Sequence, residues 1–168
     1  FEKKLIFSGD PSRFPHIVDW KHSTPLHVYA TRAEGVDYSK VHLEGWRTQQ
    51  ELLLELSKGG GFGLVWGNSE NPAEERDYYK ENVSYKLTTY LAAGIPVVVP
   101  DYLSNADYIR EKGLGFVVSS LEEASRVVQE CTAEEYDQMV TRAKYTAYLI
   151  KNGYFTKKLF IDSMMLLD

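Results

Sequence analysis

The sequence has a single cysteine, so no disulfide can form within the chain. Cys131 lies in a stretch with a helical pattern, and we interpret it as a small buried residue rather than as a reactive thiol. Because disulfides form and persist in oxidising compartments, a lone cysteine favours a reducing one, and we expect a cytoplasmic protein.

Long apolar runs are also absent. None approaches the roughly 20 residues that a transmembrane helix needs, so we expect at most peripheral association with a membrane. The net charge of −5 argues against nonspecific attraction to a polyanion, and we expect no nucleic-acid partner. The chain starts at Phe1 and enters an apolar strand almost at once, from which we expect a piece of a longer protein.

Several catalytic motifs are missing as well. No G-x-G-x-x-G follows the first predicted strand, so a dinucleotide fingerprint is absent, and no G-x-x-x-x-G-K-[ST] phosphate loop occurs. The sequence also lacks the G-x-S-x-G elbow of a hydrolase. Its four histidines do not have the spacing of a zinc site, and we interpret His27 and His42, which lie in short strands, as structural.

What the sequence does contain is an alternation of apolar strands and amphipathic helices. It predicts strands over 4–7, 26–29, 41–44, 62–66, 97–99 and 114–118, with helices over 14–20, 48–57, 85–93, 104–111, 120–131, 132–152 and 154–167. Helix N-caps are predicted at Thr48, Ser104, Ser120 and Thr132. This alternation is typical of an α/β protein with a Rossmann-like, doubly wound parallel sheet of about six strands. We expect one domain over 1–152, followed by a separate C-terminal helix over 153–168.

The segment 82–100 organises the rest of the chain. Gly94 ends the predicted helix 85–93, because a glycine adopts the left-handed conformation of a C-terminal stop without strain. Such a helix begins at the carboxyl edge of a parallel sheet, where its free amides and its dipole attract anions. The positive charge of Lys86 in the first turn interacts unfavourably with the dipole of the helix. An anionic ligand bound there would make the position of this charge favourable. We interpret the segment as part of a phosphate-binding site.

Other cationic and hydroxyl side chains follow the predicted strands at the same edge of the sheet. The candidate binding residues are Asp10, Ser12 and Arg13 after the first strand, Trp46 after the third, and Asn82, Tyr85, Lys86 and Thr89 around the helix after the fourth. Two cations with helix amides match a diphosphate, and an aromatic residue in a loop can stack on a nucleobase. Each signal taken singly is equally typical of a solvated surface. The polar stretch 68–82 is either a mobile loop on the ligand side or a solvated excursion.

Four motifs resemble one family of bacterial glycosyltransferases. Ser8-Gly-Asp-Pro-Ser-Arg-Phe-Pro-His-Ile17 is similar to the G-N-L-x-K-S-x-F-L start of its nucleotide-binding half. Gly61-Phe-Gly-Leu-Val-Trp66 and Asn82-x-x-x-Lys86-Leu-x-x-Tyr-Leu-Ala-Ala-Gly-Ile-Pro-Val-Val98 resemble later motifs, and Gly153-Tyr-Phe-Thr-Lys-Lys158 resembles its last helix. The family comprises galactofuranosyltransferase-like and glucosyltransferase 3-like enzymes with the GT-B fold, which act on surface polysaccharides and adhesins of streptococci and lactic-acid bacteria.

This resemblance implies the C-terminal, donor-binding half of an enzyme with two Rossmann-like domains. That half would hold a UDP-sugar, and an absent N-terminal domain would hold a glycan or glycoprotein acceptor of the hexose. Arg13 and Lys86 would contact the diphosphate, Asn82, Tyr85 and Thr89 the phosphate and ribose, and the loop at Trp46 the uracil. The resemblance implies transfer without a metal or cofactor, in keeping with the lack of an Asp-x-Asp pair, and it names no catalytic base. The last helix would pack toward the absent domain.

Two positions depart from the family pattern. Asp10 stands where asparagine is usual, and its carboxylate would repel a diphosphate unless it is paired, for which Arg13 is the candidate. Thr89 stands where the wider class has the second glutamate of an E-x7-E motif, whose first position is Glu81. These departures leave open a noncatalytic partner subunit or a sugar-nucleotide sensor. A receiver-like or flavodoxin-like domain is a third reading, and the apolar last helix leaves a homo-oligomer open.

Overall fold

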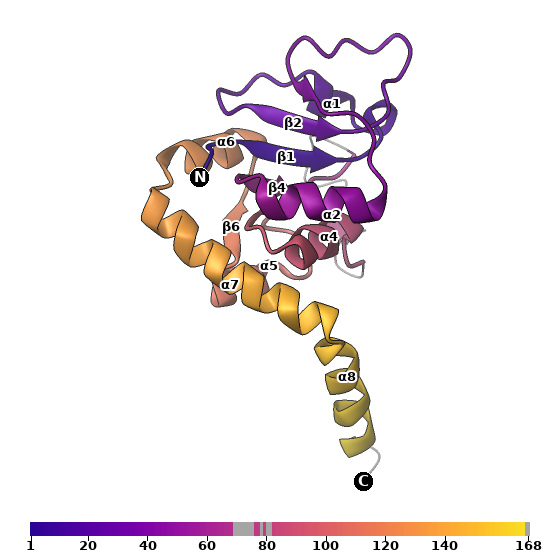
Figure 1. Cartoon of the computed structure of the whole chain (residues 1–168), viewed down its shortest axis with the longest axis vertical. Coiled ribbons are helices and arrows are strands. Elements are labelled where there is room, and N and C mark those ends of the chain that lie inside the picture. Colours follow the sequence, from indigo (N-terminus) through magenta and orange to yellow (C-terminus); the bar gives the residue numbers. More distant parts are fainter. Residues whose placement is uncertain (69–75, 78, 80–81, 167–168) are drawn as a thin grey trace.

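The structure is a computed structural model that describes residues 1–68, 76–77, 79 and 82–166. Most of the stretch 68–82, which the sequence leaves open as a ligand-side loop or a solvated excursion, lies outside the described residues, as does Glu81. The body of the protein is a sheet covered by helices, and a final helix leads away from it to the C-terminus (Figure 1).

The strands and helices follow the predicted alternation closely. The strands are β1 (Leu5–Ser8), β2 (Leu26–Tyr29), β3 (His42–Leu43), β4 (Phe62–Leu64), β5 (Val97–Pro100) and β6 (Gly115–Val118). The helices are the 3-10 turn η1 (Pro11–Arg13), α1 (Pro15–Val18), α2 (Gln49–Lys58), α4 (Tyr85–Ala93), α5 (Ala106–Lys112), α6 (Leu121–Glu130), α7 (Ala133–Lys151) and α8 (Tyr154–Met165).

All pairings in the six-stranded sheet are parallel, in the order β3-β2-β1-β4-β5-β6. This order confirms the predicted Rossmann-like, doubly wound fold. The chain builds outward from β1 to β3 and then returns to the other side of β1 at β4. The switch in strand order therefore falls between β1 and β4, and the loops at their carboxyl ends diverge there. A crevice forms at such a point because nothing covers the gap between the diverging loops.

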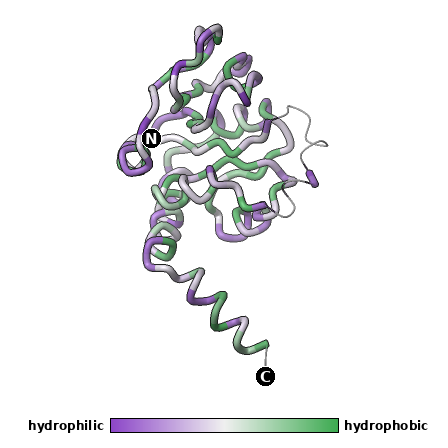
Figure 2. The backbone as a smooth tube through the Cα atoms, turned by 90° about the vertical axis from the view of Figure 1, so that its right-hand side faces the viewer, coloured by the Kyte–Doolittle hydropathy of each residue, from purple (hydrophilic) through white to green (hydrophobic). Residues whose placement is uncertain are grey.

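Alternating side chains of the strands build two apolar layers, one on each face of the sheet. Leu5 and Phe7 of β1 face the layer covered by α1 and α6, whereas Ile6 faces the layer covered by α2, α4 and α5. The same alternation separates Val98 from Val97 and Val99 in β5. Strands buried on both faces read as continuous apolar runs, which is why these segments predict a parallel sheet. In Figure 2 the hydrophobic segments gather in the middle of the body.

The first helical segment is shorter than predicted. The sequence predicts one helix over 14–20, and the structure has η1 over Pro11–Arg13 and then α1 over Pro15–Val18. Each of the two begins with a proline, whose fixed φ favours the start of a helix and whose missing N–H prevents continuation from the preceding turn. Trp20 lies beyond α1, where its indole N–H donates to the carbonyl oxygen of Thr24 at 2.8 Å.

Three of the four predicted helix caps are confirmed. Thr48, Ser120 and Thr132 each accept a hydrogen bond from the N3 amide of the helix that follows. Ser104 is the exception, because α5 starts later and its N-cap position is occupied by Asn105. The Ser104 hydroxyl instead donates to the side chain of Asn105 at 2.9 Å.

Helix α4 packs unusually close to β4. A Cβ atom at Gly63 would lie 2.4 Å from two ring carbons of Tyr90 on α4, so only glycine permits this approach. Tyr90 is fully buried, and its hydroxyl accepts a hydrogen bond from the amide of Ser8 at 2.9 Å, at the end of β1. One side chain thus ties α4 to both strands that flank the switch point.

Helix α8 makes little contact with the body. It follows Gly153, whose φ of 67° lets the chain turn away from α7, and none of its residues is buried. Its exposed apolar side chains are Tyr154, Phe155, Leu159, Phe160, Ile161, Met164 and Met165. Among the described residues, no helix has the combination of length and apolar character that crossing a membrane requires. Packing of α8 on an N-terminal domain stays a prediction.

The contact between Gly63 and Tyr90 predicts a steric penalty at position 63. We expect Gly63→Ala to lower the free energy of unfolding by about 1–3 kcal/mol, because the core must shift to admit the methyl group, and Gly63→Leu to cost more. Gly35 is the control, since a Cβ atom there meets nothing within 4 Å and only its positive φ is strained. Urea unfolding should show a cost that rises with side-chain size at position 63 and stays nearly constant at position 35. Equal costs for alanine and leucine at position 63 would contradict this packing.

Candidate functional site

A pocket of about 610 Å³ lies at the switch point of the sheet. The loop after β1 forms one wall, and the segment that leads into α4 forms the other. We call it the switch-point pocket; its lining residues are Ser8, Gly9, Asp10, Arg13, Phe14, Asn68, Tyr79, Asn82, Val83, Ser84, Tyr85 and Lys86. The fold alone thus brings together two segments that are about half the chain apart in sequence.

Two cationic side chains line this pocket. Lys86, in the first turn of α4, holds its ammonium nitrogen 4.3 Å from the ring centroid of Phe14 and 5.0 Å from that of Phe7. Arg13 is exposed, and its guanidinium carbon lies 6.0 Å from the centroid of the Phe14 ring. Phe14 therefore contacts both cations, with the positive charges above the negative face of its ring.

The N-terminus of α4 differs from those of α2, α6 and α7. Ser84 occupies its N-cap position and is buried, yet it makes no side-chain hydrogen bond to the helix. By contrast, each of the other three helices is capped by its own threonine or serine. The amides in the first turn of a helix have no partner within the helix, so an uncapped terminus leaves donors for a ligand. At α4 these donors face the switch-point pocket.

The carboxylate of Asp10 forms its hydrogen bonds within its own loop. Its carboxylate accepts hydrogen bonds from the hydroxyl of Ser12 at 2.8 Å and from the amide of Ser12 at 3.0 Å, and so caps η1. These bonds hold the pKa of Asp10 below its usual range, with a smaller contribution from the charge of Arg13. The partner expected from the sequence, Arg13, is therefore secondary to Ser12.

A second pocket, of about 430 Å³, shares the wall formed by Ser8, Gly9 and Asp10 and extends toward the ends of β2 and β3. We call it the Trp46 pocket; Pro11, Tyr29, Ala30, Thr31, Arg32, Ala33 and Trp46 complete its lining. Trp46 is 64% exposed, whereas Trp20 and Trp66 are buried. The flat indole is thus presented at the rim, where a planar ligand could stack on it.

Arg47, next to Trp46, does not line either pocket. Its Nε donates to the carboxylate of Glu55 on α2 at 2.6 Å, which ties the loop after β3 to that helix. Burial, together with the charges of Glu55 and Glu44, raises the pKa of nearby Tyr29 to about 12. The Tyr29 hydroxyl therefore stays protonated at neutral pH, with its proton donated toward Glu55.

The structure brings together most of the residues predicted from the sequence. Asp10, Arg13, Asn82, Tyr85 and Lys86 line the switch-point pocket, and Trp46 lines the adjoining one. Ser12 and Thr89 line neither.

Ser12 and Thr89, the two predicted residues outside both pockets, each have a local hydrogen-bond partner. Ser12 is bonded to Asp10 within its loop. Thr89 is 6% exposed, and its hydroxyl donates to the carbonyl oxygen of Tyr85 one turn earlier at 3.0 Å. A mid-helix threonine often bonds backward in this way. Contact between Thr89 and a ribose remains a prediction to which this geometry lends no support.

Phe14 and Ser84 were not expected in the site. Phe14 looks from the sequence like an ordinary core residue, and its place beside Lys86 depends on the packing of β1 against α4. Ser84 carries a detectable signal, because it precedes the predicted helix at the N-cap position. Unlike the serine and threonine caps of the other helices, however, it is not followed by a glutamate three residues later.

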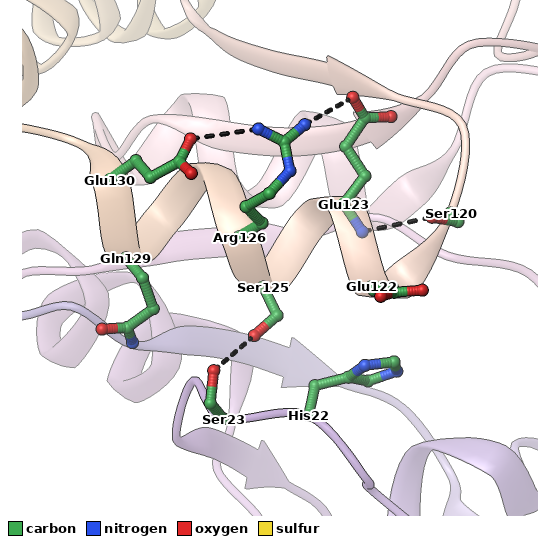
Figure 3. A pocket seen from close by; sticks show the side chains of 9 residues that line it. All are labelled: His22, Ser23, Ser120, Glu122, Glu123, Ser125, Arg126, Gln129 and Glu130. Atoms are coloured by element: carbon green, nitrogen blue, oxygen red, sulfur yellow. Dashed lines mark hydrogen bonds and ion pairs between the residues drawn. The ribbon is translucent and has the colours of Figure 1, made fainter.

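A third pocket, of about 560 Å³, lies between the loop before β2 and α6 (Figure 3). Several of its charged and polar side chains are bonded to one another. The guanidinium of Arg126 lies between Glu123 and Glu130, at 3.2 and 3.0 Å, and the hydroxyl of Ser125 points toward Ser23 (Figure 3). Ser125 also accepts from the buried amide of Thr24 at 3.1 Å. The bonds of Ser125 fasten α6 to the loop before β2, whereas those of Arg126 stay within α6, and we interpret the pocket as structural.

The strand order and the position of the main pocket define a Rossmann-like domain with its ligand crevice at the switch point. Comparison with known proteins makes this more specific. Residues 5–163 match the family model of the glucosyltransferase 3-like, C-terminal domain. The chain belongs to this family, which confirms the resemblance found in the sequence.

Two relatives and one solved structure illustrate the match. The chain is 55% identical to Glucosyltransferase 3 of Streptococcus gordonii over 165 residues, covering 98% of this chain and 49% of that protein. It is 27% identical to Beta-1,6-galactofuranosyltransferase WbbI of Escherichia coli strain K12 over 157 residues, covering 92% of this chain and 47% of that protein. The crystal structure of WaaG, a glycosyltransferase involved in lipopolysaccharide biosynthesis, aligns with a TM-score of 0.49 at 18% identity, covering 87% of this chain and 42% of WaaG. The chain thus spans about half the length of these curated relatives.

Proposed function

We propose that this chain is the donor-binding half of a glycosyltransferase that moves a hexose, glucose or galactofuranose, from a UDP-sugar to a glycan or glycoprotein acceptor. The observation that carries the proposal is the uncapped N-terminus of α4 beside Lys86 and Arg13 in one pocket. Helix amides and two cations are complementary to a diphosphate. Family membership supports the transferase class.

The two adjoining pockets match the two ends of a nucleotide. We assign the diphosphate to the switch-point pocket and the uracil to the Trp46 pocket, with the ribose crossing their shared wall at Ser8, Gly9 and Asp10. An exposed indole offers a base a stacking surface at low entropic cost, because the ring has few rotatable bonds. Asn82 and Tyr85 lie at the phosphate end of this path.

The chemistry that these residues can supply is electrostatic. When the bond between the sugar and UDP breaks, negative charge accumulates on the departing phosphate. Lys86, Arg13 and the α4 amides lie where they could stabilise that charge, and they would bind the transition state more strongly than the ground state. We expect no metal to be needed, and we assign the acceptor and any catalytic base to the other half of the full-length enzyme.

Asp10 favours a second candidate, a noncatalytic partner or sugar-nucleotide sensor. Its carboxylate lies in the wall shared by both pockets, and its low pKa keeps it charged at neutral pH. A fixed negative charge there opposes tight binding of a diphosphate. The helix amides and both cations oppose a noncatalytic partner without a phosphate ligand, which would have no need of them, whereas a sugar-nucleotide sensor would keep them.

Calorimetric titration of the chain with UDP, ADP and GDP tests the binding site. We expect UDP to bind most tightly, and Lys86→Ala or Arg13→Ala to weaken it about 10- to 100-fold, since each variant removes a charged hydrogen bond worth roughly 1.5–3 kcal/mol. Arg126→Ala is the matched control, because its cation is paired with glutamates in the third pocket. Equal weakening by all three variants, or equal affinity for the three nucleotides, would count against the assignment.

Tryptophan fluorescence tests the base end of the site. Trp46 is the exposed indole among the three tryptophans of the chain, so stacking of uracil should quench mainly its emission. We expect saturable quenching by UDP that disappears in Trp46→Leu and survives in Trp66→Phe. The same titration with inorganic pyrophosphate, which has no base, should leave the emission nearly unchanged. Quenching that persists in Trp46→Leu would place the base elsewhere.

An assay of sugar transfer separates binding from turnover. We expect this chain alone to bind UDP weakly and to transfer no sugar, because the acceptor side belongs to the other half. The full-length protein should transfer sugar from the same donor, and Lys86→Ala should abolish most of that activity. Transfer by this chain alone would refute the assignment of donor binding and acceptor binding to separate halves of the enzyme. A full-length protein that binds UDP without transferring sugar would favour the sensor.

A further inference from the structure

The head group of Lys86 lies in a corner formed by two aromatic rings. Its ammonium nitrogen is 4.3 Å from the centroid of Phe14 and 5.0 Å from that of Phe7. The two rings are 5.0 Å apart and nearly perpendicular, at 72°. We infer that Phe14, backed by Phe7, is a positioning residue that holds the Lys86 ammonium at the switch-point pocket before an anionic ligand arrives.

The rest of the fold fixes both rings. Phe7 lies in the central strand β1 and is fully buried, and Phe14, which is 5% exposed, occupies the junction between η1 and α1. Gly9 leaves room for them, because a Cβ atom there would lie 2.8 Å from Cε1 of Phe7 and 3.2 Å from Cε2 of Phe14. The corner is therefore rigid, and its position is set by residues outside α4.

A lysine at this position needs such support. Lys86 lies in the first turn of a helix, where the dipole disfavours a cation, and its stem has four rotatable carbons whose freedom is lost when a ligand fixes the ammonium. The negative faces of two rings offset the unfavourable field and restrict the stem in advance. A ligand then loses less entropy when it binds, which is the general benefit of preorganisation.

This inference rests on the proposed function for its ligand, and it adds Phe14, which is not among the binding residues predicted from the sequence. Fluorination of Phe14 tests it, because fluorine withdraws electron density from the face of the ring with little change in size. We expect the affinity for UDP to fall stepwise through mono-, di- and trifluorophenylalanine at position 14, by about 3- to 10-fold in total. The same series at Phe116, whose ring packs on Phe62 at 5.5 Å, should change the affinity less than about twofold.

A thermodynamic cycle with Lys86 separates positioning from structure. In a Lys86→Met background, which keeps an apolar stem and removes the charge, trifluorophenylalanine at position 14 should no longer weaken residual UDP binding. A structural role of Phe14 would instead weaken binding equally in both backgrounds, and that result would overturn the inference. So would a fluorine series without effect in the original background.

Nuclear magnetic resonance of the ligand-free chain keeps failure of this inference distinct from failure of the proposed function. Protons beside the Lys86 ammonium should resonate upfield because they lie over ring faces, and Phe14→Leu should shift them back toward the values of a solvated lysine. If UDP does not bind at all, the proposed function fails and this measurement decides whether the corner holds the lysine. Unshifted lysine protons would overturn the inference whatever the nucleotide result.

Discussion

The contact on which the site depends is that of Tyr90 with β4 and β1. Its ring occupies the space left by the missing side chain of Gly63, and its hydroxyl accepts the amide hydrogen of Ser8 where β1 ends. Burial raises the pKa of Tyr90 well above its usual range, so this hydroxyl stays neutral at every physiological pH. One side chain thereby sets the distance between α4 and the sheet and fixes the start of the loop after β1. Both walls of the switch-point pocket follow from that single packing arrangement.

The fold was predictable because its physical signals are local. Apolar runs of β-branched residues bounded by prolines, such as 97–99, indicate strands covered on both faces, and glycine or capping residues mark where the helices between them begin and end. Right-handed parallel crossovers then leave few possible strand orders. Where local prediction failed, a nearby residue explains it. Pro15 sets the start of α1 within the predicted helix 14–20, after the separate turn η1 that begins at Pro11, and Asn105 occupies the N-cap position in place of Ser104.

The site was predictable only in part, because sequence position tells which edge of the sheet a residue reaches and not which way its side chain turns. Arg47 and Lys86 look alike in the sequence, as cations near strand ends. In the structure Arg47 turns to Glu55 on α2, whereas Lys86 turns to Phe7 and Phe14, more than 70 residues earlier in the chain. Thr89 shows the same limit, since its hydroxyl is satisfied by its own helix. These choices depend on tertiary packing that no local pattern encodes.

Asp10 shows how the fold and the ligand make competing demands on one residue. As a cap it stabilises η1, the turn that carries Arg13 and leads to Phe14, and so it helps to place the cation and the ring. As a charge in the shared wall of two pockets it opposes the diphosphate that those residues would hold. Asparagine would cap nearly as well without the charge. The aspartate is therefore not explained by the needs of the loop. It weakens the attraction of the site for anions, a cost that the amides of α4 and the two cations must outweigh if UDP is to bind.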